Sequence, residues 1–348
     1  MSTGDSHCRL REGCERPCGL ILAPFAEAEL RGLEDRLDIR YESWMETRRL
    51  HEPEEFAGKL NRLGASVLVI ELDFVFQEIF EAVPTLRFVG VCRAATNHVD
   101  IEAATASGVA VVNTPGRNAQ AVAEHALGLM LALARNIPVS HNYVKGGRWV
   151  NPVAPYIELR GVELGGRTLG IVGLGAIGRR LAKMAQAIGM TCIACDPFVG
   201  LPPAGVSLKD LDEVLAGSDF VSIHVPLTNE TEGLIDRRRL ALMRPTAYLL
   251  NLSDERIVDG DGLVQALIRG GVAGAAVDVF ESHPIAPDHA LLGLDNVILT
   301  PHVGGATVET IERYSRMMAD DILRFLDGKR PLNLVNPGVW ETRAATGG

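Results

Sequence analysis

Short apolar runs alternate with amphipathic stretches in the first third of the chain. Residues 19–25 (GLILAPF) form a run typical of a strand, and residues 26–37 follow with the spacing of a helix. Three further strand-like runs are separated by helical stretches such as 98–108; they are 65–72, 86–92 and 108–115. Because continuous apolar strands that alternate with helices are typical of parallel sheets, we expect a parallel sheet with helices on both faces.

A second series of the same kind begins near Arg167. Its apolar runs are residues 167–173, 191–196, 219–226, 247–253, 274–280 and 296–303. The first helix of this series has a predicted apolar face made of Ile177, Leu181, Met184, Ala185 and Ile188. Residues 119–136 are apolar almost all round, which predicts a buried helix between two domains. Residues 307–329 predict a last helix, long enough to carry the chain back onto the first domain.

The composition is that of an ordinary globular protein. At about 150 residues a domain, 348 residues predict two domains, and 47% apolar residues exclude a disordered or collagenous chain. A net charge of -10 without a basic run argues against nucleic acid and anionic membranes as partners. No apolar stretch reaches the length of about 20 residues that a membrane span needs, and residues 1–18 lack the apolar core of a signal peptide. We therefore expect a cytoplasmic protein.

The six cysteines do not form a metal-binding pattern. Cys8, Cys14 and Cys18 could bind a metal together with His7, but they lack paired C-x-x-C spacing, which favours a flexible leader over residues 1–18 and no metal site. Cys192 and Cys195 alternate through a strand-like run and are expected to be small core residues.

A glycine-rich turn follows the first strand of the second series. Gly173, Gly175 and Gly178 form a G-x-G-x-x-G motif between a strand and a helix, where such a turn binds the diphosphate of a dinucleotide. Asp196 ends the next strand, where an acidic residue accepts the ribose hydroxyls of NAD and repels the 2′-phosphate of NADP. The alternative is a plain glycine turn with a capping Asp. NAD is the predicted cofactor.

With these motifs in order, the chain resembles the D-isomer-specific 2-hydroxyacid dehydrogenase family. The resemblance rests on residues 89–100, 111–135, 173–178, 222–235, 274–280 and 296–307. It implies two Rossmann-like domains, flavodoxin-like and NAD-binding, with a cleft between them. Their ranges are residues 1–118 for the substrate-binding domain, 119–308 for the NAD domain and 309–348 for the returning helix and tail. It also implies a homodimer or homotetramer that acts on a small-molecule substrate.

The resemblance assigns binding residues by motif. Asp278 is expected at the nicotinamide carboxamide, and His224 near the adenosine, where a packing role is the simpler reading. The full cofactor-binding set is Gly173, Gly175, Ala176, Ile177, Gly178, Asp196, His224, Val225, Pro226, Thr231, Leu252, Asp278 and His302. The substrate's acid group is expected at a loop whose backbone N–H groups point to it, formed by Arg93, Ala94, Ala95, Thr96 and Asn97.

Two of the three catalytic positions depart from the family pattern. His302, in T-P-H, is present as the expected acid and base. Asp254 stands where the family has the Arg of N-x-[AS]-R-G, and His283 stands where it has the Glu of D-V-F-x-x-E-P. A lost donor costs about 3 kcal/mol of transition-state stabilisation, and a carboxylate in place of a cation adds repulsion, so an ordinary 2-oxo acid should be handled poorly.

Three explanations remain open from the sequence. In the first, Asp254 pairs with His283 or His302 and rebuilds the acid–base unit, while Arg93 or Arg256 holds the substrate's anion. In the second, the substrate differs: it is neutral or cationic near the reacting carbon, or its acid group lies further away. In the third, hydride transfer is lost and the chain is an NAD-binding scaffold or sensor. Simpler roles also exist: Asp254 as a helix cap, Arg256 as a solvated loop residue, and His125 and Trp149 as structural residues.

Overall fold

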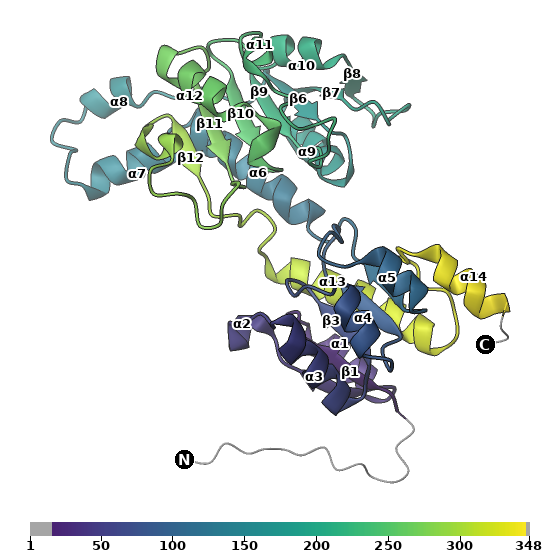
Figure 1. Ribbon diagram of the computed structural model, residues 1–348. Helices are drawn as coiled ribbons and strands as arrows, with labels where there is room; N and C mark the ends of the chain where they lie inside the picture. Colours follow the sequence, from purple (N-terminus) through teal and green to yellow (C-terminus); the bar gives the residue numbers. More distant parts are fainter. Residues whose placement is uncertain (1–15, 346–348) are drawn as a thin grey trace. The chain divides into compact units, whose positions relative to one another are not determined.

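The computed structural model describes residues 16–345, which divide into two compact units. Unit 1 contains the described residues through Arg117 and those from Thr307 onward (Figure 1). Unit 2 is the segment between them, Asn118–Ala306. Unit 2 is therefore an insertion into unit 1, with borders within two residues of the positions 118 and 308 expected from the sequence.

The sheet of unit 1 has five parallel strands in the order β2-β1-β3-β4-β5. The strands are β1 (Cys18–Ile21), β2 (Asp38–Tyr41), β3 (Ala65–Ile70), β4 (Phe88–Val91) and β5 (Ala110–Asn113). Cys18 pairs with Asp38 and Ala65 at the start of β1, so the prediction that the flexible leader reaches residue 18 was wrong. Cys8 and Cys14 lie outside the described residues.

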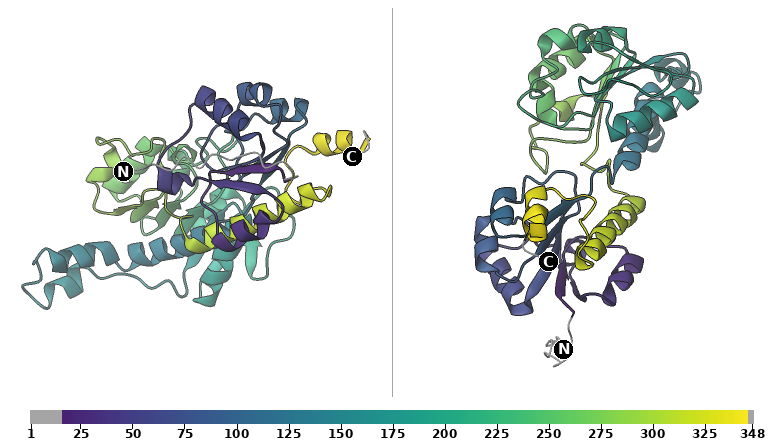
Figure 2. Two further views of the ribbon diagram at one scale, coloured as in Figure 1. Left: turned by 90° about the horizontal axis from the view of Figure 1, so that it is seen from below. Right: turned by 90° about the vertical axis from the view of Figure 1, so that its right-hand side faces the viewer.

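Successive residues of each strand point to opposite faces of this sheet, and helices cover the apolar side chains on both faces. Leu20 and Leu68 pack under one group of helices, α3 (Pro53–Leu63), α4 (Gln77–Ala82) and α5 (Ile101–Ala106). Ile21 and Val69 pack under the other group, α1 (Glu27–Glu34), α13 (Val308–Leu326) and α14 (Pro337–Ala345). Figure 2 shows α13 beside α1 on one side of the sheet. The short α2 (Trp44–Thr47) follows β2.

The sheet of unit 2 has seven parallel strands in the order β12-β11-β10-β9-β6-β7-β8. They are β6 (Thr168–Val172), β7 (Thr191–Cys195), β8 (Val206–Leu208), β9 (Phe220–Ile223), β10 (Tyr248–Asn251), β11 (Gly274–Val277) and β12 (Val297–Leu299). The chain runs outward from β6 to β8 and then returns to β9 on the other side of β6. The strand order thus reverses beside β6, and the expected parallel α/β fold is confirmed in both units.

Helices also cover both faces of the second sheet. One face packs against α6 (Ala119–Ala134) and α9 (Ala176–Ala187); the other packs against α10 (Leu211–Gly217), α11 (Arg237–Leu240) and α12 (Gly260–Arg269). Leu181 and Ala185 of α9 are buried as predicted, but Ile188 is 41% exposed because the helix ends at Ala187. Helices α7 (Ile137–Lys145) and α8 (Ala154–Glu158) and the 3-10 turns η1 (Glu255–Ile257) and η2 (Ala290–Gly293) complete the unit.

Candidate active site

The glycine turn after β6 has three positions with different physical demands. Gly173 has φ +96°, and a side chain there would meet the backbone of His224. Gly178 lies in the first turn of α9, where a side chain would collide with the carbonyl oxygen of Gly173. Gly175 faces open space and precedes α9 without a side-chain cap. The turn thus leaves room for a diphosphate next to free N–H groups of the helix end, at the switch point of the sheet.

Asp196 lies beside this turn. Its Oδ2 accepts the N–H of Leu174 at 2.8 Å, and its Oδ1 accepts the N–H of Phe198 at 2.9 Å. These bonds fix the carboxylate and leave each oxygen with acceptor capacity, which suits ribose hydroxyls. The same carboxylate therefore supports the turn and fits the predicted cofactor role.

Four of the predicted cofactor-binding residues follow β9, and Leu252 follows β10. His224 contacts Ser222 Oγ through Nε2 at 2.8 Å, while its Nδ1 is buried without a partner among the described residues. Burial lowers the pKa of His224 to about 4, so its ring is neutral at pH 7. Thr231 Oγ1 donates to the carbonyl of Pro226 at 2.6 Å and closes the loop. Leu252 is buried, and Val225 packs against a core cluster.

Asp278 holds the loop that carries His302. Its carboxylate accepts the Thr300 hydroxyl at 2.5 Å and the N–H groups of Val303 and Gly304 at 3.0 and 2.9 Å. His125 lies 3.6 Å from the same carboxylate. Burial raises the pKa of Asp278, but these hydrogen bonds outweigh it and bring the pKa to about 2. Asp278 is therefore an ionised anchor of the loop, a role that the family motif alone did not indicate.

His302 adopts a left-handed backbone conformation, with φ +55°. Its N–H donates to the carbonyl of Asp278 at 2.8 Å, which turns the chain sharply after β12. The exposed imidazole lies against a second imidazole: Nδ1 of His302 is 2.9 Å from Nε2 of His283. Although 19 residues separate them, the two histidines form a hydrogen-bonded pair.

Asp254 is bonded to Arg256. Arg256 donates to the carboxylate from Nε at 3.0 Å, from Nη2 at 3.1 Å and from its backbone N–H at 3.0 Å. Burial raises the pKa of Asp254, but the hydrogen bonds and the charge of Arg256 outweigh burial and keep the pKa below its usual value. The first explanation foresaw a direct Asp254–imidazole pair. In the structure Asp254 is hydrogen-bonded to Arg256, and His283 is hydrogen-bonded to His302. The charge of Asp254 therefore acts on His283 only through space.

Comparison with known proteins places the chain in a family. The D-isomer specific 2-hydroxyacid dehydrogenase family, through its NAD-binding domain, matches residues 127–304. This chain belongs to that family. Glyoxylate reductase of Thermofilum pendens is 40% identical over 282 residues, 80% of this chain and 83% of that enzyme. Glyoxylate reductase of Pyrococcus furiosus is 36% identical over 333 residues, 94% of this chain and 98% of that enzyme.

A solved structure agrees with this assignment. The TT0316 protein of Thermus thermophilus superposes with a TM-score of 0.80 at 34% identity, covering 91% of this chain and 99% of that chain. The predicted family and cofactor are confirmed: this D-2-hydroxyacid dehydrogenase family member has an NAD-binding domain, and NAD is its cofactor. Bound NAD would lie on the turn from Gly173 to Gly178, with its ribose at Asp196.

The loop of unit 1 that was expected to hold the substrate's acid group follows β4. Within residues 16–345, the Arg93 guanidinium has no hydrogen bond or ion pair with another side chain, although it is half-buried. The carboxylate of the nearby Glu71 forms an ion pair with Arg117 instead, at 2.8 Å. The N–H groups of residues 94–97 donate to no other described protein group. Unit 1 therefore offers a cation and a row of free donors at the carboxyl end of a strand.

Sequence reasoning missed Glu255 and His289. Glu255 occupies the Gly position of the N-x-[AS]-R-G motif, and its carboxylate contacts His289 and the backbone of Glu281. The substitution itself was a visible signal. The contacts were not, because 34 residues separate Glu255 from His289.

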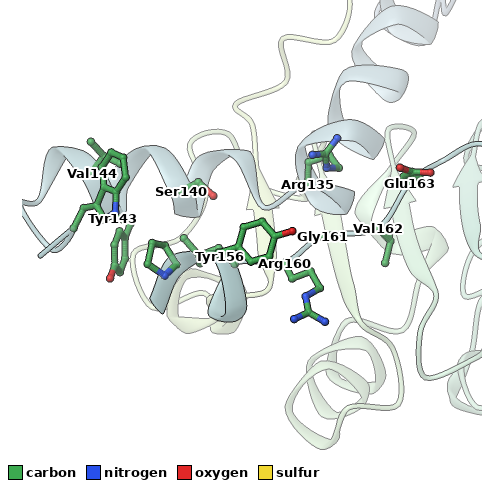
Figure 3. A pocket seen from close by; sticks show the side chains of 12 residues that line it. Arg135, Ser140, Tyr143, Val144, Tyr156, Arg160, Gly161, Val162 and Glu163 are labelled. Atoms are coloured by element: carbon green, nitrogen blue, oxygen red, sulfur yellow. The ribbon is translucent and has the colours of Figure 1, made fainter. Parts of the chain in front are cut away.

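A hollow of about 570 Å³ lies between α7, α8 and the segment after α8 (Figure 3). Its lining includes Arg135, Tyr143, Tyr156 and Glu163 and none of the predicted site residues. Trp149 also lines it and is 58% exposed. Among residues 16–345, no helix is both long and apolar enough to cross a membrane, and no three His, Cys, Asp or Glu side chains are grouped to hold a metal.

Proposed function

We propose that this protein transfers hydride between NAD(H) and a small hydroxy or oxo compound, with His302 as the acid and base. When bound, NADH supplies the hydride. The observation that carries the proposal is the hydrogen bond between His302 and His283, because it orients the imidazole as the family's Glu would. In reduction, the ring of His302 gives a proton to the carbonyl oxygen of the substrate while the carbonyl carbon takes the hydride. In oxidation, the same ring takes the hydroxyl proton.

The role of His283 follows from hydrogen-bond chemistry. When His302 carries a proton on both nitrogens, its Nδ1 donates to Nε2 of His283, so His283 must be neutral at that nitrogen. A neutral acceptor stabilises an imidazolium less than a carboxylate does. His283 is therefore proposed to orient the ring of His302 without the negative charge that the family's Glu would supply.

The substrate is proposed to be atypical for the family. The family's Arg position carries Asp254, and the nearest guanidinium, Arg256, is already paired with it. The acid group of a substrate is therefore proposed to bind Arg93 and the N–H groups of residues 94–97, without a contribution from the position that Asp254 occupies. A substrate that is neutral near this carbon fits the same geometry.

A second candidate, an NAD-binding scaffold without turnover, is favoured by the same loss of the catalytic Arg. One experiment separates the two. Loss of NADH absorbance is followed with 2-oxo acids, aldehydes and imines, for the wild-type chain and for His302→Ala. Turnover that His302→Ala abolishes, while calorimetry shows that the variant still binds NADH, supports the dehydrogenase. No turnover with any compound, despite NADH binding, supports the scaffold.

A further inference from the structure

One carboxylate connects both ends of the loop that carries His283. Oε2 of Glu255 accepts the N–H of Glu281 at 2.8 Å, and Oε1 of Glu255 lies 2.7 Å from Nε2 of His289. The loop from residue 281 to residue 289 thus begins and ends at the same side chain. We call these two contacts the Glu255 clip.

The far end of the clip is itself fixed. Nδ1 of His289 accepts the N–H of Leu291 at 3.3 Å, so its Nε2 carries the hydrogen and donates it to Glu255. The ring also packs edge-on against Phe280 at 6.1 Å. With side chains 19% and 24% exposed, Glu255 and His289 are partly shielded from water, which strengthens a charge-assisted bond.

The near end of the clip is equally firm. Glu255 opens the 3-10 turn η1, whose Ile257 is fully buried. The carbonyls of Arg256 and Ile257 accept the N–H groups of Gly233 and Ile235 at 2.8 and 2.9 Å. The clip therefore connects a rigid turn to the loop.

The loop has little else to hold it. Residues 281–284 are exposed, including His283, and Ile285 is only partly buried. Ile285 packs against the core of unit 2, but a segment that is mostly exposed opens at low cost. His283 bonds to His302 at 2.9 Å and loses this bond if the loop moves away, so the loop must be restricted, and the clip is placed to do so.

We propose that Glu255 is a positioning residue: by holding residues 281 and 289, it keeps His283 in hydrogen-bond contact with His302. The family motif has Gly at position 255 and Glu at position 283, where this chain has Glu and His. The two departures act together. In the family pattern the carboxylate at position 283 contacts the catalytic histidine directly, whereas in this chain the carboxylate at position 255 holds the loop of His283, which contacts His302 instead. The catalytic consequence rests on the proposed function, whereas the effect on the loop does not.

The test compares wild type with Glu255→Ala, Glu255→Gln and His289→Ala. Glu232→Ala is the matched control, because its exposed carboxylate also acts on the charge of Arg256 but is bonded to neither Glu281 nor His289. Amide hydrogen exchange is measured across residues 281–289, and ¹⁵N NMR follows the imidazoles of His283 and His302. Should Glu255→Ala fail to fold, His289→Ala removes the contact between Glu255 and residue 289 and leaves the contact between Glu255 and residue 281 in place.

We expect exchange in this loop at least tenfold faster in Glu255→Ala, loss of the imidazole–imidazole signature, and intermediate values for Glu255→Gln and His289→Ala. Where a substrate turns over, kcat falls about tenfold and the KM for NADH stays constant. Wild-type exchange and NMR in all three clip variants would overturn the proposal, and so would a loosened loop with unchanged kcat. If no substrate turns over, the exchange and NMR results still test the clip, while the dehydrogenase proposal alone fails.

Discussion

Oδ2 of Asp278 accepts the N–H of Gly304 at 2.9 Å, two residues beyond the imidazole of His302. The same carboxylate bonds Thr300 and Val303, and the carbonyl of Asp278 accepts the N–H of His302. One residue at the end of β11 thus fixes the turn that presents the proposed acid. The pKa of Asp278 is lowered because its ionised carboxylate is the form that accepts these hydrogen bonds.

Asp278→Asn is therefore expected to destabilise the protein by about 2 kcal/mol at pH 7. The pKa is about 2 in the folded protein, below the usual value of 3.8, so the carboxylate stabilises the fold fully above about pH 4. This contribution is lost as the pH falls from 4 to 2. Urea unfolding of variant and wild type at pH 7 and at pH 3 measures the difference, with the exposed Asp288→Asn as control. A difference that does not shrink at pH 3 contradicts the account.

Substitutions of two glycines in the turn should separate an effect on stability from an effect on cofactor binding. Gly175→Ala adds a side chain in open space at φ -76°, so the free energy of unfolding should stay constant or rise by about 0.5 kcal/mol. Its NADH affinity should fall at least tenfold, because the added methyl group fills the diphosphate's place. Gly178→Ala should instead destabilise the protein by 1–3 kcal/mol, roughly the effect of overpacking. Calorimetry with NADH and thermal unfolding measure the two effects, and an NADH affinity of Gly175→Ala equal to that of wild type would show that the turn binds no diphosphate.

His98 predicts acid sensitivity in unit 1. It is 5% exposed, and neither ring nitrogen has a partner among the described residues. Burial and the charge of Arg93 lower its pKa to about 4, against the opposing charge of Asp73. Between pH 6.5 and 4 the unfolded chain therefore binds a proton that the folded chain excludes, so stability falls on acidification, by up to about 3 kcal/mol at this residue. His98→Gln should flatten the stability curve over this range; parallel curves for variant and wild type would refute the assignment.

The expected homodimer or homotetramer remains a prediction, and the segment from α7 to α8 is where we expect a second copy to bind. Large apolar side chains are exposed along it, among them Val150 at 89% and Ile157 at 60%. The double change Val150→Asp and Ile157→Asp should yield monomers in light scattering after gel filtration. Ile268→Asp is the control, since Ile268 is 62% exposed on α12. An unchanged mass for the double variant would place the interface elsewhere.

The strands and the cofactor turn could be predicted because they depend on local patterns. The apolar run that ends at Val172 and the glycines after it specify a strand, a turn and a helix within twenty residues. β2 was missed because its residues, Asp38–Tyr41, are all half-buried and carry no continuous apolar run. Local pattern therefore predicts the framework and the strand-end location of His302.

The partners of the site residues could not be predicted in the same way. The sequence offers several cations with which the Asp254 carboxylate could pair. In the structure it pairs with the one nearest in sequence, Arg256. His283 reaches His302 only because the clip at Glu255 shapes an exposed loop, and no periodicity records such a contact. The sequence showed that the catalytic identities had changed; the new pairings depend on tertiary geometry.

The insertion of unit 2 into unit 1 has a consequence for protein engineering. Within unit 2, Asn118 packs against Gly305, so the segment leaves the unit beside the point where it began. Within unit 1, the side chain of Arg313 donates to the carbonyl of Arg117, so the two severed ends there are neighbours as well. Unit 2 is thus connected to unit 1 through two neighbouring chain crossings. We expect that it can be removed, or inserted into another protein, at these two points, and that a short linker can join the two remaining ends of unit 1.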